Sequence, residues 1–396
     1  MKYAIIIPDG AADLPLDDLG GRTPFEAAKI PTIDSIVAMG RLGTVRNVPD
    51  GYPAGSDVAI MSLLGYDPTE YYSGRAPLEA AAMGIKVTDD EWIFRCNLVT
   101  IIDDIMEDYS AGHISTEEAS AIIAALQSTL NDTSVHLYPG VAYRHIMTVS
   151  GDMDVTTTPP HDILGQGIAR HLPRGEGSEV LLALMDRARY ILADCDINAV
   201  RKDLGENPAT DIWLWGQGKM PKLDPFFQKY GVHGAAISAV DLVRGIARLM
   251  DWDVLTVEGA TGYVDTNYEG KGRMAVQALD HYDMVCVHVE GTDEAGHNAD
   301  FKGKIHALEQ IDKYIVAPVL ERLKKEGDDW RILILPDHPT PCDVRTHTRE
   351  AVPFVIAGRG IESGPAERKF TEAQAAQSDL HVEKGCNLME YFLTVY

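Results

Sequence analysis

Five short segments of this chain are apolar at nearly every position, and they constrain its fold more than any other feature. They are Tyr3–Ile7, Val254–Val257, Met284–Val289, Ile332–Leu335 and Val352–Ala357. Such β-branched, apolar runs are typical of parallel strands that are covered on both faces. Segments with helical periodicity lie between them, as in Lys304–Lys325, where apolar residues recur every three or four positions. This alternation predicts an α/β fold with a mostly parallel sheet between layers of helices.

The middle of the chain, residues 81–220, has a different pattern. A helix is predicted to begin at the capping box Ser115-Thr116-Glu117-Glu118, a second to cover about Glu179 to Leu192, and a strand to cover Tyr143–Val149. The first parallel strand precedes this region and the other four follow it. We therefore interpret 81–220 as an inserted, smaller α+β domain, and residues 1–80 and 221–396 as one discontinuous core domain.

The charge and the cysteines exclude several classes of partner. With 60 acidic residues against 35 basic ones, the net charge of −25 argues against binding to nucleic acid or to an anionic membrane. No apolar stretch approaches the roughly 20 residues that cross a bilayer. The five cysteines lie far apart without CxxC pairs, which favours a cytoplasmic location over an oxidising compartment. A small anionic ligand remains compatible with this charge if cations are supplied locally. The oligomeric state stays open.

Acidic and histidine side chains follow three of the predicted strands. They are Asp9, Asp293, His297, Asp337 and His338, with His347 a little further along the chain. Any one of them alone is explained as a turn, a cap or a surface group. Together they would meet beyond the carboxyl ends of the strands, where ligands bind in open parallel sheets. Carboxylates and imidazoles suit Mn²⁺ or Zn²⁺, and six ligands exceed the needs of one tetrahedral ion. We therefore predict a two-metal site for phosphoryl chemistry.

Ser56, in GYPAGSDVAIMSLLGYDP, has two interpretations. It precedes an apolar run that predicts a buried helix, so it is suited to cap that helix through its oxygen. The first turn of a helix also attracts phosphate, and Gly55 would let a ligand come close. A divalent cation lowers the pKa of a bound oxygen by several units, so beside a metal centre Ser56 would be an activated nucleophile.

The motifs PDGAAD, GSDVAIMSLLGYDP, DEAGH, DHPTP and THT, in this order, resemble the metal core of the alkaline phosphatase superfamily. The longer segments GRAPLEAAAMGI, DYSAGHIS, PPHDI, IWLWGQGK, GATGYVDTNYEGK and VHVEGTDEAGH resemble the cofactor-independent phosphoglycerate mutases of the archaeal type. The resemblance extends over essentially the whole chain. It implies an alkaline-phosphatase-like fold and the interconversion of 3-phosphoglycerate and 2-phosphoglycerate without 2,3-bisphosphoglycerate.

The resemblance also implies a division of the ligands between two ions. Asp9, Asp337, His338 and Ser56 would hold one ion, and Asp293, His297 and His347 the other. Mn²⁺ is the expected metal, with Zn²⁺, Co²⁺ and Mg²⁺ as alternatives. Ser56 would take the phosphoryl group to give phosphoserine and enzyme-bound glycerate, and the insert would close over the glycerate and exclude water.

The insert must supply a cationic partner for the glycerate carboxylate and a group that moves protons. Candidates are Arg144, His145, His161 and Asp162, together with Lys271 in the hinge-like segment YEGKGR. The resemblance implies a general acid/base role for Asp162 and a phosphate contact for Lys271. For Arg144, a solvated surface role remains the alternative. In one departure from many relatives, which read E-A-P-D, Thr292 stands where they have proline, and this predicts a less rigid loop.

Two other function classes fit the same core. One is a different phosphoryl-transfer enzyme: a homoserine kinase-like phosphotransferase, a phosphatase or a phosphonate hydrolase. The other is a metal- or phosphate-binding protein without catalysis, although neither Ser56 nor any ligand is missing. Since the insert would select the substrate, the core motifs alone do not decide between these classes.

Overall fold

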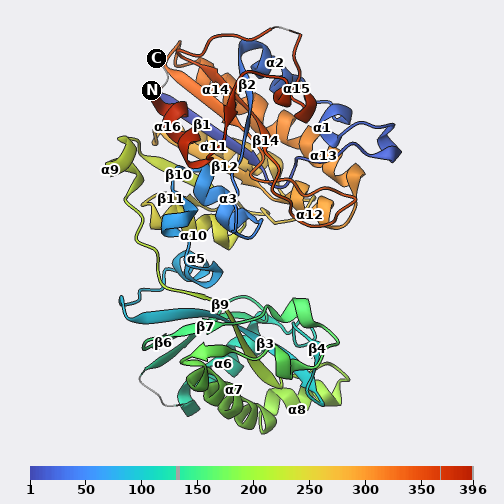
Figure 1. The fold of residues 1–396 in the computed structure, drawn as a ribbon, viewed down its shortest axis with the longest axis vertical. Coiled ribbons are helices and arrows are strands. Elements are labelled where there is room, and N and C mark those ends of the chain that lie inside the picture. Colours follow the sequence, from blue (N-terminus) through green and yellow to red (C-terminus); the bar gives the residue numbers. More distant parts are fainter. Residues whose placement is uncertain (131–133, 366, 395–396) are drawn as a thin grey trace. The chain divides into compact units, whose positions relative to one another are not determined.

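The structure is a computed structural model that describes residues 1–130, 134–365 and 367–394. The chain forms two compact units (Figure 1). The first unit contains residues 1–72 and 222–396, and the second contains residues 73–221. The first boundary thus lies at 72/73, earlier than the predicted 80/81. The reason is that helix α5 (Arg75–Ala82) packs against strands of the second unit.

The first unit is built on an eight-stranded sheet. Its order is β11 (Asp253–Leu255), β10 (Gly234–Ile237), β12 (Met284–Val289), β1 (Lys2–Pro8), β13 (Trp330–Ile334), β14 (Val352–Gly358), β2 (Gly40–Val45) and β15 (His381–Val382). All five predicted strands are present. Strands β2, β10 and β15 were not predicted, because they are short or interrupted by glycine and polar residues.

The sheet is mostly parallel, as predicted, with one exception. Strand β14 runs antiparallel to both of its neighbours, β13 and β2. The expectation that this strand is parallel was therefore wrong. Its apolar pattern reflects burial on both faces, which is the same for a buried strand of either direction.

Helices cover both faces of this sheet. Ala4 and Ile6 of β1 pack into a core shared with α2, α11, α13 and α14, while the alternating Ile5 and Ile7 are also fully buried. The helices of this unit are α1 (Pro24–Ala27), α2 (Pro31–Met39), α3 (Ser56–Leu63), α4 (Pro68–Tyr71), α9 (Phe226–Tyr230), α10 (Asp241–Leu249), α11 (Tyr268–Ala278), α12 (Gly291–His297), α13 (Phe301–Ile311), α14 (Ala317–Lys324), α15 (Glu372–Ala376) and α16 (Cys386–Thr394). The predicted helix Lys304–Lys325 corresponds to α13 and α14, which a π-helical turn, Asp312–Val316, joins.

The second unit has its own sheet and core. Its main sheet has the order β4 (Ile105–Asp108), β3 (Glu91–Ile102), β6 (Arg144–Ser150) and β5 (Val135–Tyr138), with β9 (Asp211–Gly218) also paired to β3, and β7 (Asp154–Thr156) pairs separately with β8 (Arg174–Glu176). The predicted helices correspond to α6 (Thr116–Leu130) and α7 (Ser178–Ala193), and α8 (Asp196–Asp203) follows them. Ser115 and Glu118 make the reciprocal bonds of the predicted capping box. The predicted mixed α+β character of this region is therefore confirmed.

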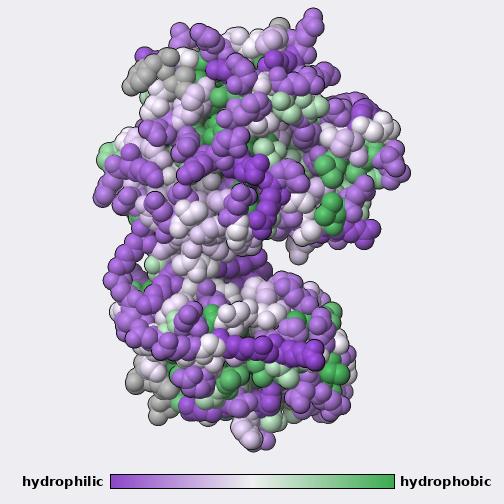
Figure 2. Space-filling model, in the orientation of Figure 1, coloured by the Kyte–Doolittle hydropathy of each residue, from purple (hydrophilic) through white to green (hydrophobic). Residues whose placement is uncertain are grey.

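The surface is largely hydrophilic in the view of Figure 2, and hydrophobic residues appear there only in small scattered groups. Among the described residues, no helix is both long and apolar enough to cross a lipid bilayer.

Candidate metal centre

Asp9 lies at the middle of the site because β1 lies in the middle of the sheet. It directly follows β1, between β12 and β13, and is fully buried. The segments that carry Asp293 and Asp337 follow these two neighbouring strands. The parallel directions of β1, β12 and β13 therefore bring three carboxylates together at one edge of the sheet, as predicted from the strand ends.

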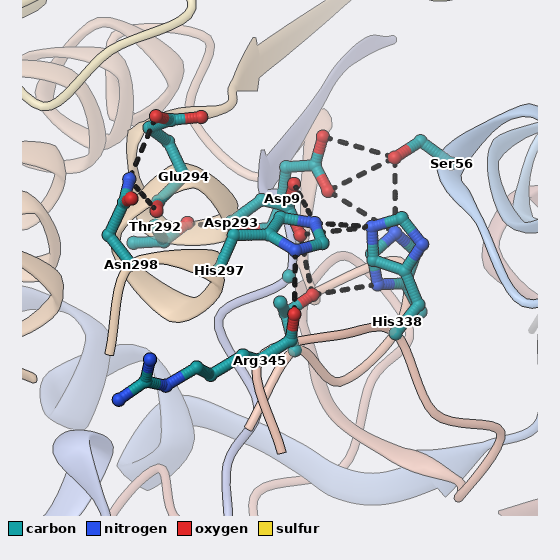
Figure 3. Close-up of polar contacts among 12 residues, drawn as sticks. Asp9, Ser56, Thr292, Asp293, Glu294, His297, Asn298, His338 and Arg345 are labelled. Carbon is teal, nitrogen blue, oxygen red and sulfur yellow. Dashed lines mark hydrogen bonds and ion pairs between the residues drawn. The ribbon is translucent and has the colours of Figure 1, made fainter. Parts of the chain in front are cut away.

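Ser56 is the first residue of α3 and points toward Asp9 and His338 (Figure 3). Its Oγ lies 3.2 Å from Asp9 Oδ1 and 3.1 Å from His338 Nε2. The N-cap of this helix is Gly55, and no side chain caps it. The capping interpretation of Ser56 is therefore wrong, and its hydroxyl belongs to the acidic and histidine cluster.

Asp337 is held by backbone hydrogen bonds on one side, and on the other its Oδ2 lies 3.4 Å from His338 Nε2 without a hydrogen bond. Its Oδ1 accepts hydrogen bonds from the N–H groups of Gly10 and His338, but its buried Oδ2 has no hydrogen-bond partner among the described residues. Gly10 adopts a positive φ of 60°, and a Cβ there would lie 2.4 Å from Asp293 Oδ1. The glycine thus allows the loop after β1 to approach the second carboxylate closely.

Asp293, His297 and His347 form the other half of the cluster. Asp293 and His297 share one face of α12, with His297 Nε2 3.3 Å from Asp293 Oδ2, and His347 Nε2 lies 3.4 Å from Asp293 Oδ1. Each histidine donates its Nδ1 hydrogen to a backbone carbonyl, that of Arg345 for His297 and that of Ala54 for His347. In the neutral rings both Nε2 atoms therefore direct lone pairs at the carboxylate and at each other, whereas a protonated ring donates its Nε2 hydrogen to Asp293.

The buried charges of the cluster perturb one another. Burial, reinforced by the negative charges of Asp337 and Asp293, raises the pKa of Asp9 well above its usual range. Burial also acts to raise the pKa of Asp293, but hydrogen bonds to His297 and His347 outweigh it, so this pKa lies well below its usual range. Like charges so close together need a positive counter-charge to remain ionised.

A pair of divalent cations fits this donor set. Two groups of side chains place one ligand atom each within reach of a common ion: Asp293 with His297 and His347, and Asp9 with Asp293 and His338. The unpartnered Asp337 Oδ2 adds an oxygen donor to the second group. Buried carboxylates and imidazoles with free lone pairs match the preferences of Mn²⁺ and Zn²⁺.

Two further residues contact Asp9, and a third contacts one of these two; none was predicted in this role. His288 Nε2 lies 2.8 Å from Asp9 Oδ2, and burial lowers the pKa of His288 to about 4. Thr292 donates its hydroxyl hydrogen to the Asp9 carbonyl. Lys271, predicted as a phosphate contact, is buried and donates to the His288 carbonyl at 3.0 Å, and burial lowers its pKa to about 8. His288 and Thr292 lie in the segment VHVEGTDEAGH, but that pattern does not reveal their partner.

The predicted substrate residues of the insert lie within the second unit, and one of them is separate from the others. His161 packs against Trp215 and lies 3.7 Å from the exposed Asp162. Arg144 and His145 are neighbours on β6, so their side chains point to opposite faces. Arg144 is exposed, whereas His145 is buried and accepts a hydrogen bond from the Gly140 N–H. The structure therefore does not bring His145 together with Arg144.

Two arginines that were not predicted complete a cationic cluster in the insert. Glu79 forms ion pairs with both: its Oε2 lies 2.9 Å from Arg95 Nε, and its Oε1 lies 3.3 Å from Arg75 Nε. The Arg95 guanidinium carbon also lies 4.1 Å from the centre of the Trp215 ring. Burial, together with the positive charges of Arg75 and Arg144, lowers the pKa of Arg95 to about 10 despite the negative charge of Glu79. Three arginines against one glutamate leave excess positive charge, although the whole chain is strongly acidic. Arg75 lies in the segment GRAPLEAAAMGI, which could have drawn attention to it.

Known proteins are similar to this chain in sequence and in fold. A family model described as 2,3-bisphosphoglycerate-independent phosphoglycerate mutase matches residues 38–198. A protein of that name from Methanosarcina mazei is 50% identical to this chain, over 98% of this chain and 98% of its own length. Another, from Methanothrix thermoacetophila, is 46% identical, over 99% of this chain and 100% of its own length.

Solved structures agree with this result. A protein from Pyrococcus horikoshii matches with a TM-score of 0.84 at 30% identity, over 99% of this chain and 96% of that one. A cofactor-independent phosphoglycerate mutase from Thermoplasma acidophilum matches with a TM-score of 0.67 at 26% identity, over the whole of both chains. Because relatives of 46% to 50% identity span nearly its full length, this chain belongs to the family of 2,3-bisphosphoglycerate-independent phosphoglycerate mutases.

Proposed function

We propose that this protein interconverts 3-phosphoglycerate and 2-phosphoglycerate through a phosphoserine at Ser56, at a site that holds two divalent cations. The observation that carries the proposal is the position of Ser56 Oγ, within 3.3 Å of both oxygens of Asp9 and 3.1 Å from His338 Nε2. A hydroxyl at the first residue of a helix also lies beside free backbone N–H groups that attract a phosphoryl group. The names of the relatives support the choice of phosphoglycerate as substrate.

The two groups of ligands described above would each hold one ion. Asp9, Asp337, His338 and Ser56 would hold the first, and Asp293, His297 and His347 the second. Two ions, Mn²⁺ in our proposal, would supply positive charge to the phosphoryl oxygens and lower the pKa of the serine hydroxyl. Asp9 and His338 orient Ser56, and the backbone carbonyls of Arg345 and Ala54 fix the rings of His297 and His347.

The reaction is balanced in two halves. In the first, Ser56 Oγ loses its proton and forms a bond to phosphorus, while the bond from phosphorus to the C3 oxygen breaks and that oxygen gains a proton. In the second, the C2 hydroxyl loses a proton and bonds to phosphorus, while the bond from phosphorus to Ser56 Oγ breaks and that oxygen regains a proton. No water and no net proton are consumed. We assign proton transfer at the glycerate hydroxyls to Asp162, which is exposed beside His161.

We assign recognition of the substrate carboxylate to the insert. The cluster of Arg75, Arg95 and Arg144 carries more positive charge than Glu79 neutralises, and arginine binds carboxylates through paired hydrogen bonds. His161 lies on Trp215 beside this cluster. Lys271, with its buried ammonium, is the proposed phosphate contact in the first unit.

Turnover and a trapped intermediate test the proposal together. The wild-type protein, supplied with Mn²⁺ and 3-phosphoglycerate, should form 2-phosphoglycerate in an assay coupled to enolase. Mass spectrometry after rapid quenching should find one phosphoryl group on the peptide that contains Ser56. Ser56→Ala should lose both signals, while Ser62→Ala, a matched change in the same helix, should keep both. Parallel assays with Zn²⁺, Co²⁺ and Mg²⁺ identify the preferred metal.

Other outcomes would select another function. Phosphate release without 2-phosphoglycerate would indicate a phosphatase, and transfer from ATP to homoserine without mutase activity would indicate a kinase-like enzyme. Full turnover by Ser56→Ala would refute the phosphoserine mechanism.

A further inference from the structure

A chain of three hydrogen bonds connects the backbone after β10 to Asp9. The Val240 N–H donates to Ser238 Oγ at 3.0 Å, Ser238 Oγ contacts His288 Nδ1 at 3.2 Å, and His288 Nε2 contacts Asp9 Oδ2 at 2.8 Å. Asp9 and His288 are fully buried, and Ser238 is 8% exposed. The residues lie on or directly after the adjacent strands β10, β12 and β1.

The chemistry of the groups fixes the direction of these bonds. An ionised carboxylate only accepts hydrogen bonds, so His288 Nε2 must carry the hydrogen that lies between it and Asp9. His288 Nδ1 then accepts, and the hydroxyl of Ser238 donates to it while its oxygen accepts from the Val240 N–H. Asp9 therefore selects the tautomer of His288, and Ser238 stabilises that tautomer by donating to Nδ1.

The rest of Asp9 is held as well, and of its two carboxylate oxygens only Oδ2 is bonded to His288. The Asp9 N–H donates to the Val289 carbonyl, and its own carbonyl accepts from Thr292. Lys271 donates to the carbonyl of His288 and so anchors the backbone that carries the ring. With Oδ2 bonded to His288, Oδ1 is the oxygen that lies 3.5 Å from His338 Nε2, while Ser56 Oγ is within 3.3 Å of both oxygens.

We infer that Ser238 and His288 are positioning residues: through the hydrogen bond of His288 to Oδ2 they turn the carboxylate of Asp9 so that Oδ1 faces the ion shared with Ser56. This inference rests on the proposed function, because it requires Asp9 to be a ligand. The two residues touch neither the substrate nor Ser56 in this role. Their effect is on the affinity of one ion and, through it, on the reaction.

Titration calorimetry of metal-free protein with Mn²⁺ tests the inference without relying on catalysis. Outer partners of metal ligands typically contribute about 10- to 100-fold in metal affinity. His288→Phe should therefore lower the Mn²⁺ affinity of the Asp9 site by about that factor. His288→Gln, whose amide can still donate to Asp9, should restore most of the affinity. Ser238→Ala should weaken the same ion by about 3- to 10-fold, as expected for one lost neutral hydrogen bond. Asp337→Asn identifies which binding transition belongs to the Asp9 site.

Two controls separate positioning from general damage. Ser378→Ala removes a hydroxyl that is 7% exposed elsewhere in the same unit and should leave both Mn²⁺ affinities unchanged. Circular dichroism verifies folding, and if His288→Phe does not fold, Ser238→Ala decides the question.

The inference is overturned if the Asp9-site affinity of folded His288→Phe equals that of the wild type, or if His288→Gln is as weak as His288→Phe. It is also overturned if Ser378→Ala changes the Mn²⁺ affinity of the Asp9 site by the same factor as Ser238→Ala. If the wild type itself binds no Mn²⁺, the proposed function fails instead.

Discussion

The Nε2 atoms of His297 and His347 lie 2.9 Å apart, with the two rings nearly perpendicular to each other. Each ring uses its Nδ1 hydrogen on a backbone carbonyl, so the two nitrogens that face each other are both acceptors in the neutral rings. Two lone pairs at this distance repel unless a cation lies against them. Asp293, on the same helix as His297, completes this arrangement: its two carboxylate oxygens lie 3.3 Å and 3.4 Å from the Nε2 atoms of His297 and His347.

Removal of one of these nitrogens should remove one ion. His347→Ala is expected to lower the Mn²⁺ content from two ions per chain to one, and to reduce kcat by more than about 100-fold, since even outer partners of ligands contribute about 10- to 100-fold. Elemental analysis after gel filtration measures the content, and the enolase-coupled assay measures kcat. His306→Ala, at an exposed position on α13, is the control and should behave as the wild type. A His347→Ala protein that still holds two ions would contradict the ligand assignment.

The sequence predicted the centre of this site because its ligands follow strand ends. A carboxylate or histidine after a buried apolar run is visible in the sequence, and the parallel sheet then brings distant runs together, as for Asp9 and Asp337. His288 lies inside such a run, where a single histidine shows burial but not its partner. Arg95 lies in a strand and pairs with Glu79 on a helix, and no local pattern indicates this pairing.

The direction of β14 and the role of Ser56 could not be predicted from the sequence pattern alone. The apolar pattern of Val352–Gly358 depends on burial, so it carries no information about strand direction. Ser56 fits both a helix cap and a nucleophile by residue type, and taken alone it favours the cap. Only its three-dimensional neighbours, Asp9 and His338, distinguish the two interpretations.

Arg144 tests the cationic cluster of the insert. Its side chain is exposed, with the guanidinium 5.8 Å from the centre of the Tyr143 ring, so Arg144→Ala should leave the fold intact. Loss of a charged hydrogen bond to the substrate carboxylate should raise KM for 3-phosphoglycerate about 10- to 100-fold with little change in kcat. Arg170→Ala, another exposed arginine of this unit, is the control. An unchanged KM would assign Arg144 to the solvated surface instead.

Lys271 should impose an upper limit on the working pH. Burial lowers its pKa to about 8, so the ammonium is charged below that pH and becomes neutral as the pH rises through it. If the charged form binds phosphate, kcat/KM should fall as the pH rises from about 7 to about 9. Lys271→Met should have a low kcat/KM at pH 7 and should lack this decrease. A wild-type profile that is flat across this range, or one identical to that of Lys271→Met, would exclude the phosphate contact.

A buried ion pair behind the site should be essential for the stability of the first unit. Lys304 Nζ lies 2.7 Å from Asp13 Oδ2 and 2.8 Å from the Thr340 carbonyl, and both charged side chains are fully buried. Lys304→Met leaves the carboxylate of Asp13 buried without its cation, which typically costs about 3 to 5 kcal/mol in the free energy of unfolding. Urea denaturation of the metal-free protein, followed by circular dichroism, measures this cost separately from any loss of metal.

The matched control is Lys302→Met, on the same helix but exposed, for which we expect a change within about 0.5 kcal/mol. Through its bonds to Asp13 and to the Thr340 carbonyl, the lysine joins the loop after β1 to the loop after β13. If Lys304→Met were as stable as Lys302→Met, the pair would contribute nothing to folding. The closeness of these two loops would then have to come from their other hydrogen bonds, which the Cys342 N–H donates to Asp13 and the Thr340 N–H donates to the Gly10 and Ala12 carbonyls.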